Sequence, residues 1–170
     1  MGYERPHKLE DALAILGRGG VRVAAGCTDL FAATEDKALR GDVLDLTAVA
    51  ELRGIAPRSG GGLRIGGTTT WADIARAELP PALRSLQEAA RQVGAHQVQN
   101  RGTLAGNLCN ASPAADGVPP LLTLDAEVEL ISAGGTRVLP LPEFLLGPRH
   151  TALAPGEIVA AVRVPGAALG

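Results

Sequence analysis

A helix, a buried strand and the start of a second helix follow one another within the first 32 residues, and this order limits the fold most. Apolar residues from Leu9 to Leu16 recur at helical spacing and stop at a glycine cluster. The run Val21–Ala25 indicates a buried strand, after which Thr28 or Asp29 can cap a short helix. A second strand is expected at Val43–Leu46. Strand–turn–helix units with short connections predict a small sheet with some parallel pairing.

A second block of elements begins after the loop 57–62, whose three consecutive glycines indicate a hinge or a hairpin tip. A strand is expected at 63–65. Thr70 is a suitable cap for a helix at 71–77, and a proline pair then begins a longer amphipathic helix. The block therefore opens with a strand and two helices.

Three further apolar runs indicate strands near the end of the chain, at Val128–Ile131, Val138–Leu139 and Ile158–Val164. Gly134–Gly135 is typical of a hairpin turn, so we expect these strands to form a meander. The second block is predicted to be α+β. Placing the boundary before the glycine loop gives a small N-terminal α/β subdomain at 1–55 and a larger α+β subdomain at 56–170.

Composition excludes several functional classes. The chain has 170 residues, of which 46% are hydrophobic and 20% charged, as in ordinary globular proteins. A net charge of −2 provides no basic field for nucleic acid. Only four aromatic residues occur, too few for base stacking, so the core must be aliphatic. Small molecules or protein partners remain as ligands.

Cysteine and histidine placement argues against a metal centre in this chain. Cys27 and Cys109 lie far apart, whereas an iron–sulfur cluster usually needs four thiolates. We interpret both as small buried apolar residues and expect His96 and His150 to lie in loops. No apolar run approaches the roughly 20 residues of a membrane span, and the charged start is unlike a signal peptide. We therefore expect no membrane contact and a cytoplasmic location.

The segment Ala25–Leu30 is the first candidate binding site. It joins a predicted strand to a predicted helix, where successive backbone N–H groups can converge on an anion such as a phosphate. The alternative is that Gly26 only permits a tight turn.

Two neighbouring segments, 100–108 and 111–117, are expected to be loops and form a second candidate site. Their glycines allow close backbone approach, Thr103 and Asn107 offer donors, and Asp116 offers an acceptor. Such groups suit a large polar cofactor. The alternative is that these residues only form turns and that Asp116 caps the following helix.

Taken together, these segments resemble the medium flavoprotein subunits of the xanthine dehydrogenase and carbon monoxide dehydrogenase family of molybdenum hydroxylases. The resemblance spans nearly the whole chain and rests on an ordered set of motifs: A-G-C-T-D-L at 25–30, I-G-G-T-T-T-W-A-D-I at 65–74, T-L-A-G-N at 103–107, A-S-P-A-A-D at 111–116, and P-G-E-I-V followed by V-R-V-P at 155–165. It implies a PCMH-type FAD-binding fold of two α/β subdomains. Family members usually continue into a third, C-terminal domain, which we expect this chain to lack.

The resemblance implies a non-covalently bound FAD whose diphosphate lies between the two glycine segments. Since neither segment contains a lysine, we expect backbone N–H groups of both to carry most of the phosphate recognition. Val23 to Leu30 would wrap it from one side, and Asp116 would lie beside the flavin or its ribityl chain. No catalytic base and no metal ligand are implied. The implied cofactor-binding residues are Val23, Ala24, Ala25, Gly26, Cys27, Thr28, Asp29, Leu30, Val93, Thr103, Gly106, Asn107, Asp116 and Val159.

Two positions depart from the family pattern. Cys27 and Ala105 stand where glycines are usual, and a positive φ at either would add strain of about 1–2 kcal/mol. The implied function is electron transfer from iron–sulfur clusters through FAD to an acceptor. The implied partners are a large subunit with a molybdenum cofactor and a small subunit with [2Fe–2S] clusters. An assembly module that has lost FAD is the alternative, and an oxidase with covalent FAD is a third reading.

Overall fold

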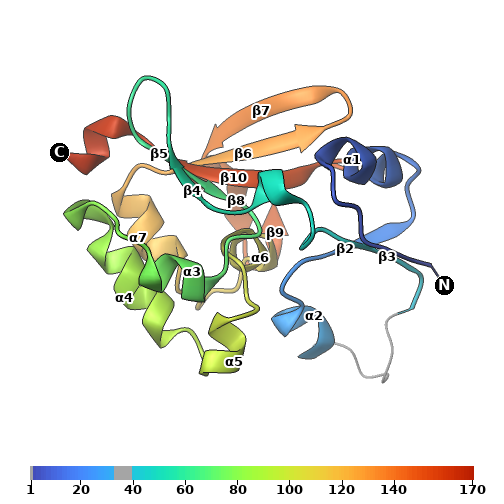
Figure 1. The fold of residues 1–170 in the computed structure, drawn as a ribbon, viewed down its shortest axis with the longest axis horizontal. Helices are drawn as coiled ribbons and strands as arrows, with labels where there is room; N and C mark the ends of the chain where they lie inside the picture. The colour runs from blue at the N-terminus through green and yellow to red at the C-terminus, as the bar shows by residue number, and fades with distance from the viewer. Residues whose placement is uncertain (1, 33–39) are drawn as a thin grey trace.

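The computed structural model describes residues 2–32 and 40–170, which form a small parallel sheet, a larger antiparallel sheet and a set of short helices (Figure 1). This confirms the α+β class. The small sheet has the order β1 (Tyr3–Glu4), β3 (Asp42–Asp45), β2 (Val21–Ala24), with all strands parallel. Its other elements are α1 (Leu9–Gly17), α2 (Thr28–Ala32) and the 3₁₀ helix η1 (Ala50–Leu52).

The small sheet with α1, α2 and η1 forms the small lobe, and the large sheet with the remaining helices forms the large lobe. In the small lobe the predicted helix, strands and parallel pairing are confirmed. β3 lies centrally because Val43 and Leu44 are both buried, so its two faces are covered. Val23 of β2 pairs with Leu44, which places the C-terminal ends of both strands at one edge of the sheet. The two-residue strand β1 was not predicted, because so short a segment carries no periodicity.

The larger sheet is antiparallel, with the order β4 (Ile55–Pro57), β5 (Leu63–Gly66), β10 (Ile158–Val164), β6 (Glu127–Ser132), β7 (Gly135–Pro140). Pro57 pairs with Leu63, so the loop 57–62 is a hairpin tip. The large sheet thus begins at β4, and the predicted boundary between residues 55 and 56 falls inside this strand. The division into subdomains at that boundary stays a prediction.

The expected meander is wrong in one respect. β6 and β7 form the predicted hairpin, in which Ser132 pairs with Gly135, but β10 lies between β5 and β6 instead of beside β7. β10 is almost entirely buried. A strand that is apolar on both faces is stable only in the middle of a sheet, and this decides its position.

β10 contributes to two hydrophobic cores, one on each face. Val159 and Val162 belong to the main core, whereas Ile158 and Ala160 pack with the core of the small lobe. Side chains along a strand alternate between faces, so 159 and 162 share a face only because the register shifts between Val159 and Ala161. Because of this bulge, the single strand β10 packs against the cores of both lobes.

Short helices cover one face of the large sheet (Figure 1). The core is largely aliphatic, as predicted, although Trp71 and Phe144 are also fully buried in it. No helix in residues 2–32 and 40–170 is long and apolar enough to cross a membrane. The remaining elements are α3 (Trp71–Arg76), η2 (Pro81–Leu83), α4 (Arg84–Gln92), α5 (His96–Gln99), α6 (Leu104–Asn110), α7 (Val118–Thr123), α8 (Leu141–Phe144), β8 (Leu145–Gly147), β9 (His150–Thr151) and η3 (Gly166–Leu169).

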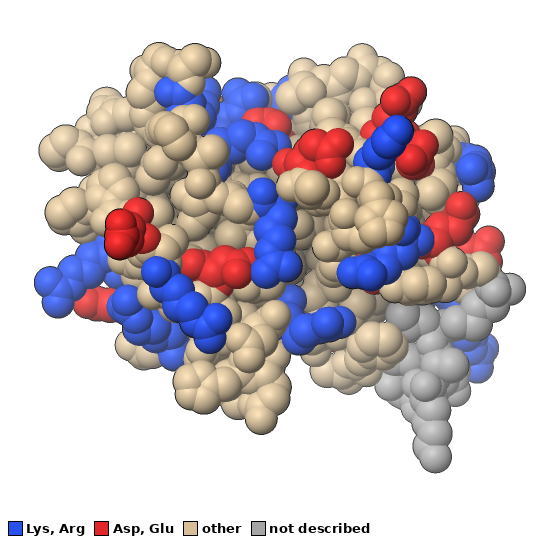
Figure 2. All heavy atoms as spheres, in the orientation of Figure 1, with Lys and Arg blue, Asp and Glu red and all other residues tan. Residues whose placement is uncertain are grey.

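Charged side chains of both signs are spread over the face shown in Figure 2, among uncharged residues. Ion pairs include Arg53 with Asp73 and Arg137 with Glu157.

Candidate functional site

A cleft of about 670 Å³ lies between the small lobe and the helices of the large lobe. The turn that joins β2 to α2 lines one side, and residues of α6 line the other. Ligands of open sheets with parallel strands bind beyond the C-terminal ends of those strands, which is where this turn lies.

The β2–α2 turn has an unusual backbone. Cys27 adopts φ +60°, a left-handed conformation that non-glycine residues rarely take. A left-handed residue between right-handed or extended neighbours orients successive N–H groups toward the same side, which makes an anion-binding concavity. Among the described residues, none accepts a hydrogen bond from the N–H groups of Gly26, Cys27 or Thr28. The turn therefore offers free donors to the cleft.

The opposite wall differs from the sequence expectation. Residues 104–110 are a helix, α6, not a loop, and Thr103 is its N-cap, accepting a hydrogen bond from the Gly106 N–H at 3.1 Å. Ala111 ends the helix with φ +42°. The sequence feature that could have predicted this helix is the pair Leu104 and Leu108, which are four residues apart. Both are fully buried.

The N–H groups of the first turn of α6 already have acceptors. Leu104 donates to the Thr69 carbonyl at 3.0 Å, Ala105 to the Gly67 carbonyl at 3.1 Å, and Asn107 to the Thr103 carbonyl. The expectation that backbone N–H groups of both segments would be available for a phosphate is thus met by the β2–α2 turn only. On α6, side chains must supply the polar contacts.

Asn107 is the best placed of these side chains. Its Oδ1 accepts a hydrogen bond from the Gly117 N–H at 3.2 Å, and this fixes the orientation of the amide. No described residue accepts a hydrogen bond from its Nδ2 group, which remains as a donor in the lining of the cleft.

Asp116 also lines the cleft. The alternative that it caps the following helix is wrong, because the N-cap of α7 is Gly117 and no side chain caps this helix. The carboxylate is left as an acceptor for a ligand.

The two cysteines are not the buried residues that we expected. Both line the cleft; Cys27 is half-buried and Cys109 is exposed. Burial raises the pKa of the Cys27 thiol, the charge of Asp45 adds to this effect, and Arg101 opposes it. Cys109 lies in a concave wall that solvent reaches, where surrounding protein atoms raise the pKa of its thiol to about 12. Neither thiol is an activated nucleophile.

Every residue that the resemblance implied lies in the lining of this one cleft. Val93 follows α4 and Val159 lies on β10, so the walls come from segments far apart in sequence. Other lining residues were not expected: Gly67, Thr68, Trp71, Asn110 and Ser112. Gly67, Thr68 and Trp71 belong to the motif at 65–74, to which no binding role was given, and Ser112 lies in the candidate segment 111–117.

The chemistry of the lining fits a dinucleotide such as FAD. Free backbone N–H groups suit a diphosphate, apolar side chains such as Val23 and Val159 suit flat rings, and Asp116 and Asn107 suit hydroxyl and amide groups. No group of three metal-ligating side chains occurs in the described part of the chain. The lobes and this lining define the class as a domain that binds a flavin dinucleotide.

The chain belongs to the family described as the FAD binding domain in molybdopterin dehydrogenase, whose model matches residues 1–167. FAD is therefore its cofactor. The chain is 33% identical over 166 residues to the xanthine dehydrogenase FAD-binding subunit of Escherichia coli O157:H7, covering 96% of this chain and 57% of that protein.

Two further relatives agree. The nicotinate dehydrogenase FAD-subunit of Eubacterium barkeri is 37% identical over 168 residues, covering 92% of this chain and 55% of that protein. A solved structure of carbon monoxide dehydrogenase from Hydrogenophaga pseudoflava matches with a TM-score of 0.87 and 28% identity, covering 98% of this chain and 59% of that one. The chain thus spans little more than half the length of these relatives.

Proposed function

We propose that this chain holds FAD in the cleft between its lobes and serves as the electron-transfer flavoprotein part of a molybdenum hydroxylase complex. The observation that carries this proposal is the set of free N–H groups at Gly26, Cys27 and Thr28 in the lining of the cleft. The names of the relatives, which are FAD-binding subunits of dehydrogenases, support it.

The diphosphate of FAD would lie against the turn 25–30, with Thr103, Gly106 and Asn107 on the opposite side. Among the described residues no Lys or Arg lines the cleft, and Arg101 is the cation whose charge acts on Cys27 of the turn, so backbone donors would do most of the binding. Val93 and Val159 would contact the apolar parts of the cofactor, and Asp116 would lie beside the flavin or its ribityl chain.

When bound, FAD supplies redox chemistry in one- and two-electron steps, and the protein orients it and limits its exposure to water. We assign no catalytic residue to the chain. In our proposal a large subunit with a molybdenum cofactor oxidises the substrate, a small subunit with [2Fe–2S] clusters delivers electrons to the cleft, and an acceptor removes them. The cytoplasmic location stays a prediction.

Titration of the purified chain with FAD and with FMN tests the binding mode. Because the free donors suit a diphosphate, FAD should bind much more tightly than FMN. Binding is followed by the quenching of flavin fluorescence. Equal affinity for the two flavins would argue against diphosphate recognition. Acid precipitation should release the FAD, since no covalent attachment is proposed.

Reconstitution tests the relay. The FAD-loaded chain alone should not reduce a dye with purine, aldehyde or N-heterocycle substrates, and should do so after the cluster and molybdenum subunits are added. Bleaching of the flavin by such a substrate in the isolated chain would contradict the proposed role.

A further inference from the structure

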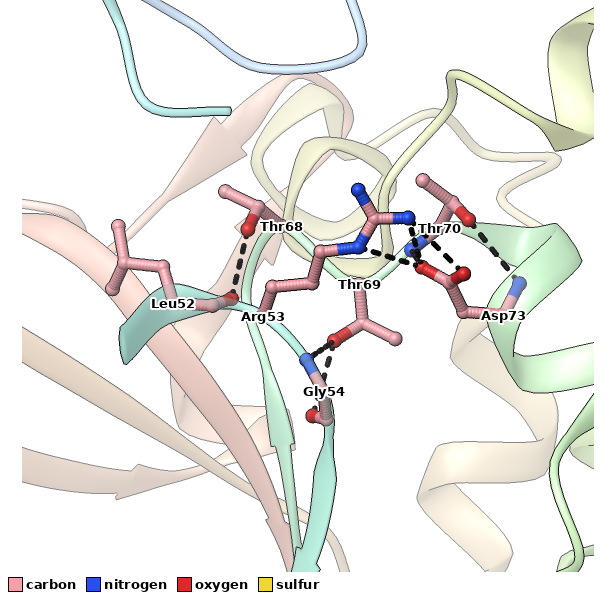
Figure 3. A network of polar contacts seen from close by, with 7 residues as sticks. All are labelled: Leu52, Arg53, Gly54, Thr68, Thr69, Thr70 and Asp73. Atoms are coloured by element: carbon pink, nitrogen blue, oxygen red, sulfur yellow. Dashed lines mark hydrogen bonds and ion pairs between the residues drawn. The ribbon is translucent and has the colours of Figure 1, made fainter. Parts of the chain in front are cut away.

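Three consecutive threonines, Thr68 to Thr70, lie buried between β5 and α3, and each hydroxyl has a backbone partner (Figure 3). Thr69 is fully buried. Buried hydroxyls destabilise a fold unless they are hydrogen-bonded, so these partners fix where the segment lies. The partners of Thr68 and Thr69 belong to the segment that joins the two lobes, and the partner of Thr70 belongs to α3.

On one side the threonines hold this joining segment, Leu52–Gly54. The Thr69 hydroxyl accepts a hydrogen bond from the Gly54 N–H at 3.0 Å and donates to the Gly54 carbonyl at 3.2 Å. The Thr68 hydroxyl and N–H both donate to the Leu52 carbonyl, at 2.9 and 2.8 Å. Leu52 ends η1 of the small lobe, and β4 of the large sheet begins at Ile55.

On the other side the same segment holds the start of α6. The carbonyl of Thr69 accepts the Leu104 N–H, and the carbonyl of Gly67 accepts the Ala105 N–H. Thr103, Gly106 and Asn107 of the cleft wall follow directly from this anchored point. Thr69 thus bonds through its side chain to the joining segment and through its backbone to the cleft wall.

A more exposed ion pair supports the same arrangement. The Arg53 side chain binds the Asp73 carboxylate, with Nη2–Oδ2 at 2.8 Å, and Asp73 completes the capping box of α3 with Thr70 (Figure 3). Arg53 lies between Leu52 and Gly54, so the joining segment is tied at three successive residues.

We propose that Thr69 is a positioning residue for FAD, which sets the distance between α6 and the β2–α2 turn without touching the cofactor. This inference rests on the proposed function. Thr69 is absent from the cleft lining, so loss of its hydroxyl removes no contact with a ligand. It leaves the Gly54 N–H without its acceptor, while the Gly54 carbonyl keeps the Gly66 N–H at 2.8 Å. The joining segment then loses one of the bonds that fix its position.

The decisive variants are Thr69→Val, which keeps the shape and removes the hydroxyl, and Thr69→Ser, which keeps the hydroxyl. Thr123→Val is the matched control, because the Thr123 hydroxyl donates to the Pro120 carbonyl at 2.8 Å on α7, outside the cleft lining. For each full-length chain, the Kd for FAD is measured by flavin fluorescence quenching and the stability of the apoprotein by urea unfolding.

We expect Thr69→Val to weaken FAD binding about tenfold, as one lost buried hydrogen-bonding group does, with Thr69→Ser within about threefold of the wild type. Thr123→Val should leave the Kd for FAD unchanged, even if it lowers the stability of the apoprotein. A wild-type Kd for Thr69→Val, or equal weakening by the serine variant, would overturn the inference.

Two further outcomes are informative. If the wild-type chain itself does not bind FAD, the proposed function fails, and not the positioning role alone. If Thr69→Val does not fold, Arg53→Met decides, because Arg53 is half exposed and its loss should be tolerated. It should weaken FAD about two- to threefold by loosening the same segment, and an unchanged Kd would count against the inference.

Discussion

The carbonyl oxygen of Arg101 occupies the space that a side chain on Gly26 would need. An ideal Cβ on Gly26 would lie 2.1 Å from that oxygen and 2.8 Å from the Gly102 Cα. The β2–α2 turn therefore touches the backbone just before α6, and the two walls of the cleft meet at this point. Gly26 is required by this close approach and not by its own φ, which is not positive.

Gly26→Ala should separate the two walls and weaken FAD binding by at least about tenfold, because the backbone of residues 101 and 102 must move by more than a few tenths of an ångström. Gly17→Ala is the control: it lies at the end of α1, and an added Cβ there meets nothing within 4 Å. Flavin fluorescence titration measures both variants. Unchanged affinity for Gly26→Ala would show that the contact does not shape the site.

Cys27→Gly should stabilise the apoprotein. The left-handed φ of +60° costs about 1–2 kcal/mol for a residue with a Cβ, and glycine removes this cost. The greater entropy of glycine in the unfolded state offsets about 0.4–1 kcal/mol of the gain. A net gain of about 0.5–1 kcal/mol in the free energy of unfolding is expected by urea denaturation. Cys27→Ala keeps the strain and should show no such gain; equal stability of the two variants would refute the strain.

Gly106→Val should remove the flavin. Even a Cβ at this position would lie 2.8 Å from the Thr103 Oγ1, the atom that caps α6. Since the residue lies in the first turn of this helix, we also expect a loss of about 1 kcal/mol from the disrupted cap. Thr103→Ala removes the same cap and should lower the stability of the apoprotein by about the same amount. Purified Gly106→Val that retains full flavin content would rule out a role for this position.

Much of the fold followed from the sequence because its signals were local. Apolar repeats gave α1, β2 and β3, and Thr70 was recognised as the cap of α3, where it forms a capping box with Asp73. The central position of β10 did not follow, because strand order depends on which strand can be covered on both faces, and that requires the whole sheet.

The motifs predicted which segments lie together, but not the geometry of one wall of the cleft. The residues implied by the motifs line one cleft, yet α6 was taken for a loop because Gly106, Asn107 and Asn110 are poor helix formers. Tertiary hydrogen bonds from Leu104 and Ala105 to the segment 67–69 stabilise its first turn. Those bonds also remove the N–H groups that sequence reasoning had assigned to phosphate, and only the structure shows this.

Glu129 should make the stability of the fold depend on pH in the acid range. It is a nearly buried carboxylate on β6, with Arg163 Nε at 2.6 Å from its Oε2 and Arg64 Nη2 at 3.1 Å from its Oε1. Burial acts to raise the pKa of this carboxyl, but the hydrogen bonds and charges of the two arginines outweigh burial and hold the pKa below its usual value.

A lowered folded-state pKa means that the stabilisation is fully present above the usual glutamate pKa of about 4.3 and is lost as the pH falls through the folded-state value. Glu129→Gln should therefore lower the free energy of unfolding by about 2 kcal/mol at pH 7. The difference from the wild type should shrink as the pH falls below about 4, where the wild-type carboxyl also becomes neutral. Urea denaturation between pH 3 and about 7 measures this, with the exposed Glu78→Gln as a control expected to stay within about 0.5 kcal/mol. A Glu129→Gln deficit that is the same at every pH would mean that shape, and not charge, is what this side chain contributes.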